Sequence, residues 1–153
     1  MRVGDAVAAY GVLKALKLTD MTEEVMRAVW HNMKALRPVA EEYEKQRKEI
    51  QESLYDEKKQ SEVEELSRME RRMRTEGYVP TADEEKRMRP VAAYLNDFNA
   101  KYTKAMNEAG EAETEVLTEK VSEDDILAVL KANGKGFEDM EKLLIIIKGD
   151  EQE

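Results

Sequence analysis

Apolar residues recur every three or four positions over long stretches of the chain, and this spacing constrains the fold most. The first stretch comprises Val25, Val29, Met33, Leu36, Ala40, Tyr43, Ile50 and Leu54. A second stretch comprises Met88, Val91, Leu95, Phe98, Tyr102 and Met106. On an α-helix such residues share one face and form a continuous seam, as in coiled-coil-like packing. We therefore expect two or three long helices that pack through these seams.

The tetrapeptide Arg-Pro-Val-Ala occurs inside both stretches, first at residues 37–40 and again at 89–92. Each copy leads into a polar helical segment with a tyrosine, which suggests two related arms. Proline removes one backbone hydrogen bond and clashes with the preceding turn, at a cost of about 3 kcal/mol in a helix interior. Pro38 and Pro90 therefore predict either a kink or a helix restart, and the sequence leaves both open.

Composition agrees with long helices and excludes several functions. Charged residues make up 39% of the 153 residues, aromatic residues 6%, and there are 7 Gly and 3 Pro. The net charge of −9 disfavours nucleic acid and anionic membranes as partners of the whole molecule. Because the chain has no cysteine, disulfides and cysteine-based metal sites are excluded. The N-terminus lacks the pattern of a signal peptide, and we expect a soluble, cytoplasmic protein.

Capping patterns place the expected helix boundaries. A short amphipathic helix is expected over residues 4–17, and residues 77–81 (Gly-Tyr-Val-Pro-Thr) form the clearest loop. We expect this loop to make the long arms antiparallel. A side-chain oxygen that accepts from a backbone N–H three residues later caps a helix. The pairs with this spacing are Asp20 with Glu23, Ser61 with Glu64, Thr81 with Glu84, and Ser122 with Asp125.

The last quarter of the chain has a different pattern. Residues 113–121 alternate imperfectly and predict a strand, residues 126–133 predict a short helix, and 137–142 predict one further turn. The apolar run Leu143 to Ile147 predicts a buried strand, with a final helix as the alternative. The expected fold is therefore mainly α. It has a long antiparallel helical hairpin or bundle over residues 1–110 and a small C-terminal strand-helix-strand element over 111–153, packed as one structural unit.

The residues of the chain give little support for a catalytic site. His31 is the only histidine, and Ala28 and Ala35 occupy the positions where a helical metal site would place further ligands. Paired carboxylates are abundant, but lysine and arginine follow them at helical spacing, as on a solvated helix face. We therefore expect no catalytic residue, no metal site and no cofactor.

One basic concentration stands out in this acidic chain. Arg68, Arg71, Arg72 and Arg74 precede the expected loop, and Lys86, Arg87 and Arg89 follow it. Glutamates lie among them, and no aromatic residues interleave for base stacking. A salt-bridge cluster is favoured over nucleic acid binding. The first four arginines are nevertheless the candidate contacts for a macromolecular partner.

Three segments of the N-terminal third stand out: Ala6-Val-Ala-Ala-Tyr-Gly-Val-Leu, Leu18-Thr-Asp-Met, and the segment from Ala28 to Glu44. In these segments the chain resembles small uncharacterised proteins of bacteriophages and prophages. The order of Val116 to Val121, Ser122 to Leu130 and Met140 to Ile147 is also similar. The resemblance implies a phage-derived context, in the bacterial host cell or associated with the phage, and no catalytic residue.

These observations predict a non-enzymatic structural or assembly protein, with a phage protein as a partner. The alternative is a regulatory or binding module that engages a macromolecule through Arg68 to Arg74. A two-helix hairpin covers one side of each seam and leaves the other side in water. We therefore expect a homodimer or a higher homo-oligomer.

Overall fold

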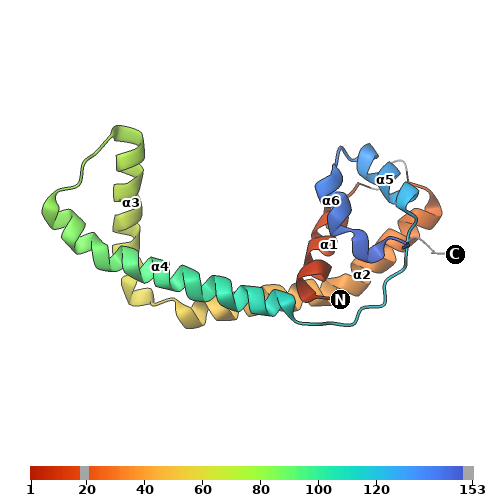
Figure 1. The fold of residues 1–153 in the computed structure, drawn as a ribbon, viewed down its shortest axis with the longest axis horizontal. Coiled ribbons are helices and arrows are strands. Elements are labelled where there is room, and N and C mark those ends of the chain that lie inside the picture. The colour runs from red at the N-terminus through yellow and green to blue at the C-terminus, as the bar shows by residue number, and fades with distance from the viewer. Residues whose placement is uncertain (18–20, 150–153) are drawn as a thin grey trace. The chain divides into compact units, whose positions relative to one another are not determined.

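The computed structural model describes residues 1–17 and 21–149 and is mainly α, as the sequence predicts (Figure 1). In these ranges the α-helices are α1 (Val3–Ala15), α2 (Glu23–Leu54), α3 (Gln60–Glu76), α4 (Ala82–Glu111), α5 (Glu123–Ala132) and α6 (Phe137–Lys142). Two 3₁₀ helices are η1 (Glu57–Lys59) and η2 (Leu144–Ile146). Helix α1 confirms the short helix expected over 4–17. No helix in the described ranges is both long and apolar enough to cross a membrane.

The chain forms two compact units. Unit 1 comprises Met1–Gln46 and Glu108–Glu153, and unit 2 comprises Arg47–Asn107. Helices α2 and α4 each pass from one unit into the other. The sequence predicted a different division, with residues 1–110 as one part and 111–153 as another. The C-terminal segment instead shares a core with α1 and the first turns of α2.

Unit 1 contains the larger core. Helix α1 packs against α6 and η2, and α5 packs against α6. Fully buried side chains come from widely separated parts of the chain, including Leu13, Leu36, Ile126, Leu143 and Ile146. The apolar face of α2 supplies the residues between these segments. Burial of each such side chain stabilises the folded state by about 1.5–3 kcal/mol.

An extended segment, which we call the strap (residues 112–121), connects α4 to α5 within unit 1. Its start pairs with the N-terminus through a bridge between Arg2 and Glu113. Near its end, the buried Asn32 holds it to α2. The Asn32 side chain donates to the Glu119 carbonyl at 2.8 Å and accepts from the Glu119 N–H at 2.7 Å. The Asn32 side-chain amide thus pairs with both the N–H and the carbonyl of Glu119, as the backbone of a neighbouring strand would.

In the predicted strand-helix-strand element, the helix is confirmed and both strands are wrong. The helix between them is α5, and the further turn is α6. The apolar run Leu143 to Ile147 forms the 3₁₀ helix η2, and residues 113–121 are extended with a bridge at each end. At the second bridge, Val121 pairs in parallel with Ile147. Because the run buries Leu143 and Ile146, three residues apart, its apolar residues meet the core at helical spacing rather than alternately.

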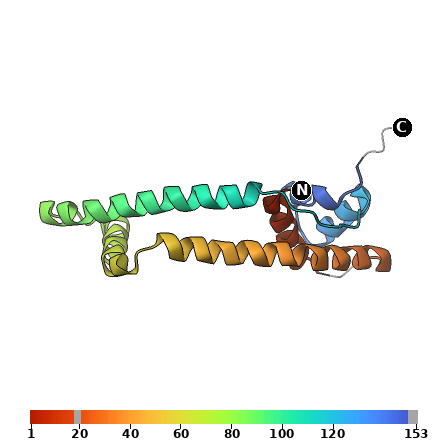
Figure 2. The same cartoon turned by 90° about the horizontal axis from the view of Figure 1, so that it is seen from below.

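Unit 2 contains α3, most of α4 and the last turns of α2, and the structure describes all of it. Its buried core comprises Leu66 of α3 with Met88 and Val91 of α4. Figures 1 and 2 show α3 lying across α4, while the last turns of α2 run antiparallel beside α4. The loop at 77–81 therefore joins α4 to the crossing helix α3. Within unit 2, the antiparallel neighbour of α4 is the end of α2.

Aromatic rings join the end of α2 to α4. The Tyr55 ring lies 5.6 Å from the Phe98 ring and 6.3 Å from the Tyr94 ring, measured between ring centres. Tyr102 stacks on Phe98 at 5.9 Å. Val63, Leu66 and Met69 of α3 belong to the core that α3 forms with α4, whereas Met73, four residues after Met69, is 43% exposed. The crossing of α3 explains this, because its C-terminal turns extend past the contact.

One predicted cap is wrong, one is confirmed, and one falls on a residue outside the described ranges. Asp20 lies outside the described residues, and the oxygen that caps α2 belongs to Thr22, which accepts from the Val25 N–H at 3.3 Å. Ser61 does not begin a helix, because η1 runs directly into α3 at Gln60. The cap at Ser122 is confirmed, since its oxygen accepts from the Asp125 N–H at 3.2 Å.

Neither proline restarts its helix. Pro38 lies inside the continuous helix α2, and Pro90 lies inside α4. Both are exposed, as are Lys34 and Lys86, whose carbonyls lose their helical partners. Water can reach these carbonyls on the exposed face, so the helices continue despite the missing bonds.

Candidate functional site

The candidate contacts lie on the C-terminal half of α3 in unit 2. Arg68, Arg71, Arg72 and Arg74 are all exposed. Leu66 and Met69 occupy the side of α3 that packs on α4. At 100° per residue, Arg68 and Arg71 project roughly opposite that side, and Arg72 lies at its edge, next to Met69. The helix therefore presents a basic surface to solvent, which we call the arginine surface.

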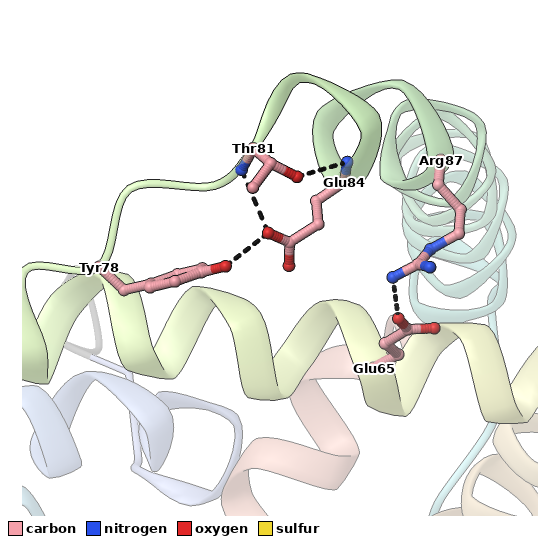
Figure 3. A network of polar contacts seen from close by, with 5 residues as sticks. All are labelled: Glu65, Tyr78, Thr81, Glu84 and Arg87. Atoms are coloured by element: carbon pink, nitrogen blue, oxygen red, sulfur yellow. Dashed lines mark hydrogen bonds and ion pairs between the residues drawn. The ribbon is translucent and has the colours of Figure 1, made fainter.

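Helix α3 ends where the sequence predicts. Gly77 has a φ of +65°, a left-handed conformation that glycine adopts without steric cost, and its N–H donates to the Arg72 carbonyl. The chain then turns into α4. The predicted pairing of Thr81 with Glu84 is confirmed in both directions (Figure 3): the Glu84 N–H donates to the Thr81 hydroxyl at 3.2 Å, and the Thr81 N–H donates to the Glu84 carboxylate at 3.1 Å.

Tyr78 extends this capping arrangement. Its hydroxyl donates to the Glu84 carboxylate, as Figure 3 shows. This bond raises the pKa of Tyr78 above its ordinary value, with burial and the Glu84 charge adding to the effect. The same bond lowers the pKa of Glu84, followed by the hydrogen bond from the Thr81 backbone. The carboxylate thus ties the loop to the first turn of α4, where its charge also meets the positive end of the helix dipole.

Two of the basic residues are held by intramolecular contacts. Arg72 lies over the Tyr78 ring, with its Cζ 4.1 Å from the ring centre, and its Nε is 3.5 Å from the Glu76 carboxylate. Arg87 of α4 forms an ion pair with Glu65 of α3 (Figure 3). These contacts agree with the predicted salt-bridge cluster. They connect α3 to the loop and to α4.

The other three arginines of the surface have no such contact. Arg68, Arg71 and Arg74 form no ion pair with any residue of unit 2 or of the rest of the described chain. The arginine surface therefore consists of one residue committed to the fold and three whose charges face solvent. These three could meet carboxylates or phosphates of a partner.

The single histidine belongs to unit 1. His31 is exposed, and its Nε2 lies 3.3 Å from the Leu117 carbonyl oxygen of the strap. Within the described residues, no three His, Asp or Glu side chains come together in a way that could hold a metal ion.

Sequence reasoning missed Asn32, although a signal was present. Asn32 lies three residues after Val29 and four before Leu36, inside the apolar seam, and it is fully buried. A polar side chain at a seam position must find partners in the interior. The missing information was the identity of the partner, since Glu119 is far away along the chain.

No family model matches the chain, and no curated protein or solved structure matches it.

Proposed function

We propose that the chain is a non-enzymatic structural or assembly protein that acts through helix-mediated self-association and partner contacts. The observation that carries this proposal is the shallow core of unit 2. Only Leu66, Met88, Val91 and Met106 are buried in this fully described unit, although it contains three α-helical segments. Leu95, Phe98 and Tyr102 continue the seam of α4 and remain partly exposed.

Pairing of two copies through the seam would cover these partly exposed residues. A stable protein–protein interface removes about 800 Å² from each partner, and a closed four-helix arrangement is the simplest such pairing.

The origin and location belong to the same proposal. The resemblance of the N-terminal segment to bacteriophage and prophage proteins supports a phage context. A partner would then be another phage protein, in the cytoplasm of the bacterial host or in the particle.

Cysteine cross-linking tests the proposed seam, because the chain has no cysteine of its own. Tyr102→Cys places a thiol on the partly exposed seam, and Ala100→Cys places one on the exposed face of the same helix as the matched control. With a short bis-maleimide reagent, the proposal predicts a covalent dimer from Tyr102→Cys and monomer from Ala100→Cys. Equal cross-linking of both variants, or of neither, would contradict it.

A second candidate function is a binding module that uses the arginine surface. The observation that favours it is the absence of intramolecular ion pairs at Arg68, Arg71 and Arg74. A gel shift with duplex DNA at physiological salt tests nucleic acid as the partner. Binding should fall steeply with added salt and disappear when all three arginines become glutamate. No shift at any salt concentration would leave this surface without a nucleic acid role.

A further inference from the structure

A groove lies between α5 and α6 in unit 1, with a volume of about 330 Å³. Leu130 and Met140, which are 2% and 8% exposed, line it and belong to the core. Leu127 and Phe137 also line it, but they are 40% and 82% exposed. The groove therefore joins buried apolar atoms to apolar side chains that nothing in the described chain covers.

Helical spacing explains how this groove arises. Leu127 precedes Leu130 by three residues on α5, and Phe137 precedes Met140 by three residues on α6. Residues three apart share one face of a helix. The apolar face of each helix thus continues one position beyond the core, and the two extensions meet at the same place. A phenylalanine left in water forgoes the stabilisation that burial provides, so an exposed apolar pair beside a groove is typical of an interaction site.

The charges at the groove have one sign. Lys131 and Lys135 line it, and no carboxylate does. Neither lysine forms an ion pair within the part of the chain that the structure describes. Gly134, with a φ of +66°, turns the chain at the end of α5, and the Lys135 N–H donates to the Leu130 carbonyl at 2.8 Å. Lys131 and Lys135 thus lie on either side of this turn, and both line the groove. Two unpaired cations at one groove are notable in a chain of net charge −9.

We propose that this groove is a docking site for a short peptide segment of a partner protein, with bulky apolar side chains flanked by carboxylates. The apolar floor and walls would receive the apolar side chains, and Lys131 and Lys135 would pair with the carboxylates. The volume suits one or two bulky side chains rather than the whole face of a long helix. The site is separate from the seam of unit 2, and the proposal does not depend on self-association.

Fluorescence anisotropy with three labelled synthetic peptides tests the proposal on the full chain. The first peptide alternates leucine and phenylalanine with glutamate. The second replaces each glutamate by lysine, and the third replaces each apolar residue by serine. The expected result is saturable binding of the first peptide and at least about tenfold weaker binding of the other two. Equal binding of all three, or no binding of the first up to about 1 mM, would overturn the proposal.

Variants of the chain locate the binding. The double variant Lys131→Glu with Lys135→Glu should lose at least about tenfold in affinity for the first peptide. Lys45→Glu with Lys104→Glu makes the same change in net charge at exposed positions that do not line the groove and should bind as the unmodified chain does. Phe137→Ser should also weaken binding, and a thermal melt followed by Trp30 fluorescence checks that unit 1 stays folded. Equal losses in both lysine pairs would overturn the proposal, because general charge attraction would then explain the binding.

A second copy of the chain is the competing occupant. Light scattering of Phe137→Ser separates the two cases. The proposal predicts the same mass for this variant and the unmodified chain at equal concentration. A lower mass for Phe137→Ser would show that the groove is covered by another copy, and the partner peptide would be ruled out.

Discussion

Replacing Asn32 by alanine should destabilise unit 1 substantially. The side chain is fully buried, and both of its polar atoms bind the backbone of Glu119. Alanine removes two hydrogen bonds worth about 1 kcal/mol each and leaves part of the side-chain volume empty. Because the Glu119 residue is exposed, water can replace some of the lost contacts. We therefore expect a loss of about 2–3 kcal/mol in the free energy of unfolding.

Trp30 makes this loss measurable for unit 1 alone. It is the single tryptophan of the chain, it lies two residues before Asn32 on α2, and it is 52% exposed. Its fluorescence in a urea titration reports the unfolding of unit 1, whereas circular dichroism reports the helices of both units. In a thermal melt the midpoint should fall by at least about 5 °C.

Matched variants separate the Asn32 contact from a general effect of substitution. Asn96→Ala removes the same side chain at an exposed position of α4 and should change stability by no more than about 0.5 kcal/mol. Asn32→Asp keeps an acceptor for the Glu119 N–H but places a buried carboxylate against the Glu119 carbonyl, so it should destabilise at neutral pH. If Asn32→Ala unfolds at the same urea concentration as Asn96→Ala, the side chain does not hold the strap.

Three further predictions follow from named contacts. Because the pKa of Glu84 is lowered, the carboxylate stabilises the fold fully above the ordinary carboxyl pKa, and this stabilisation is lost as the pH falls through the lowered pKa. Because the pKa of Tyr78 is raised, its hydroxyl stabilises the fold fully below the ordinary tyrosine pKa, and this stabilisation is lost as the pH rises through the raised pKa. An NMR titration should therefore show the Glu84 pKa moving back toward 4.5 in Tyr78→Phe, and an unchanged value would contradict the hydrogen bond. Gly11→Ala should stabilise α1 by about 0.5–1 kcal/mol in a thermal melt, because nothing lies within 4 Å of the new Cβ. Gly4→Ala should give less or none of this gain, since its Cβ would lie 3.2 Å from the Gly110 carbonyl oxygen, and equal gains would show that this close approach is unimportant. Pro90→Ala should stabilise unit 2 by restoring one helical hydrogen bond to the Lys86 carbonyl, and a lower melting temperature by circular dichroism would contradict this account of the exposed proline.

The sequence predicted the long helices well because their apolar residues repeat over many turns. Val25 to Leu54 and Met88 to Met106 extend over enough turns that only a helix places their apolar residues on one face. The pairing of Thr81 with Glu84 was also predictable, since both partners lie within one turn. The run Leu143 to Ile147 was not, because a segment of five apolar residues fits a strand or a helical turn equally well. Its conformation depends on α1 and α6, which pack against η2.

The sequence predicted which residue types form the candidate site, but it did not predict which residues contact each other there. The arginines near Gly77 are evident in the sequence, but the contact between Arg87 and Glu65 joins residues on two different helices. The groove beside Phe137 depends in the same way on how α5 and α6 meet, which local patterns do not encode. Asn32 was recognisable as a polar residue in an apolar seam, while its partner in the strap required the fold.

Sedimentation equilibrium over a concentration series is the most direct test of the proposed self-association. The seam of unit 2 contains partly exposed residues such as Phe98 and Tyr102 that a second copy would cover. From about 1 to 100 µM, the account predicts a mass approaching at least twice the 17.6 kDa of one chain, with dissociation on dilution. A mass of 17.6 kDa throughout this range would show that the chain needs no second copy, and it would contradict assembly through the seam.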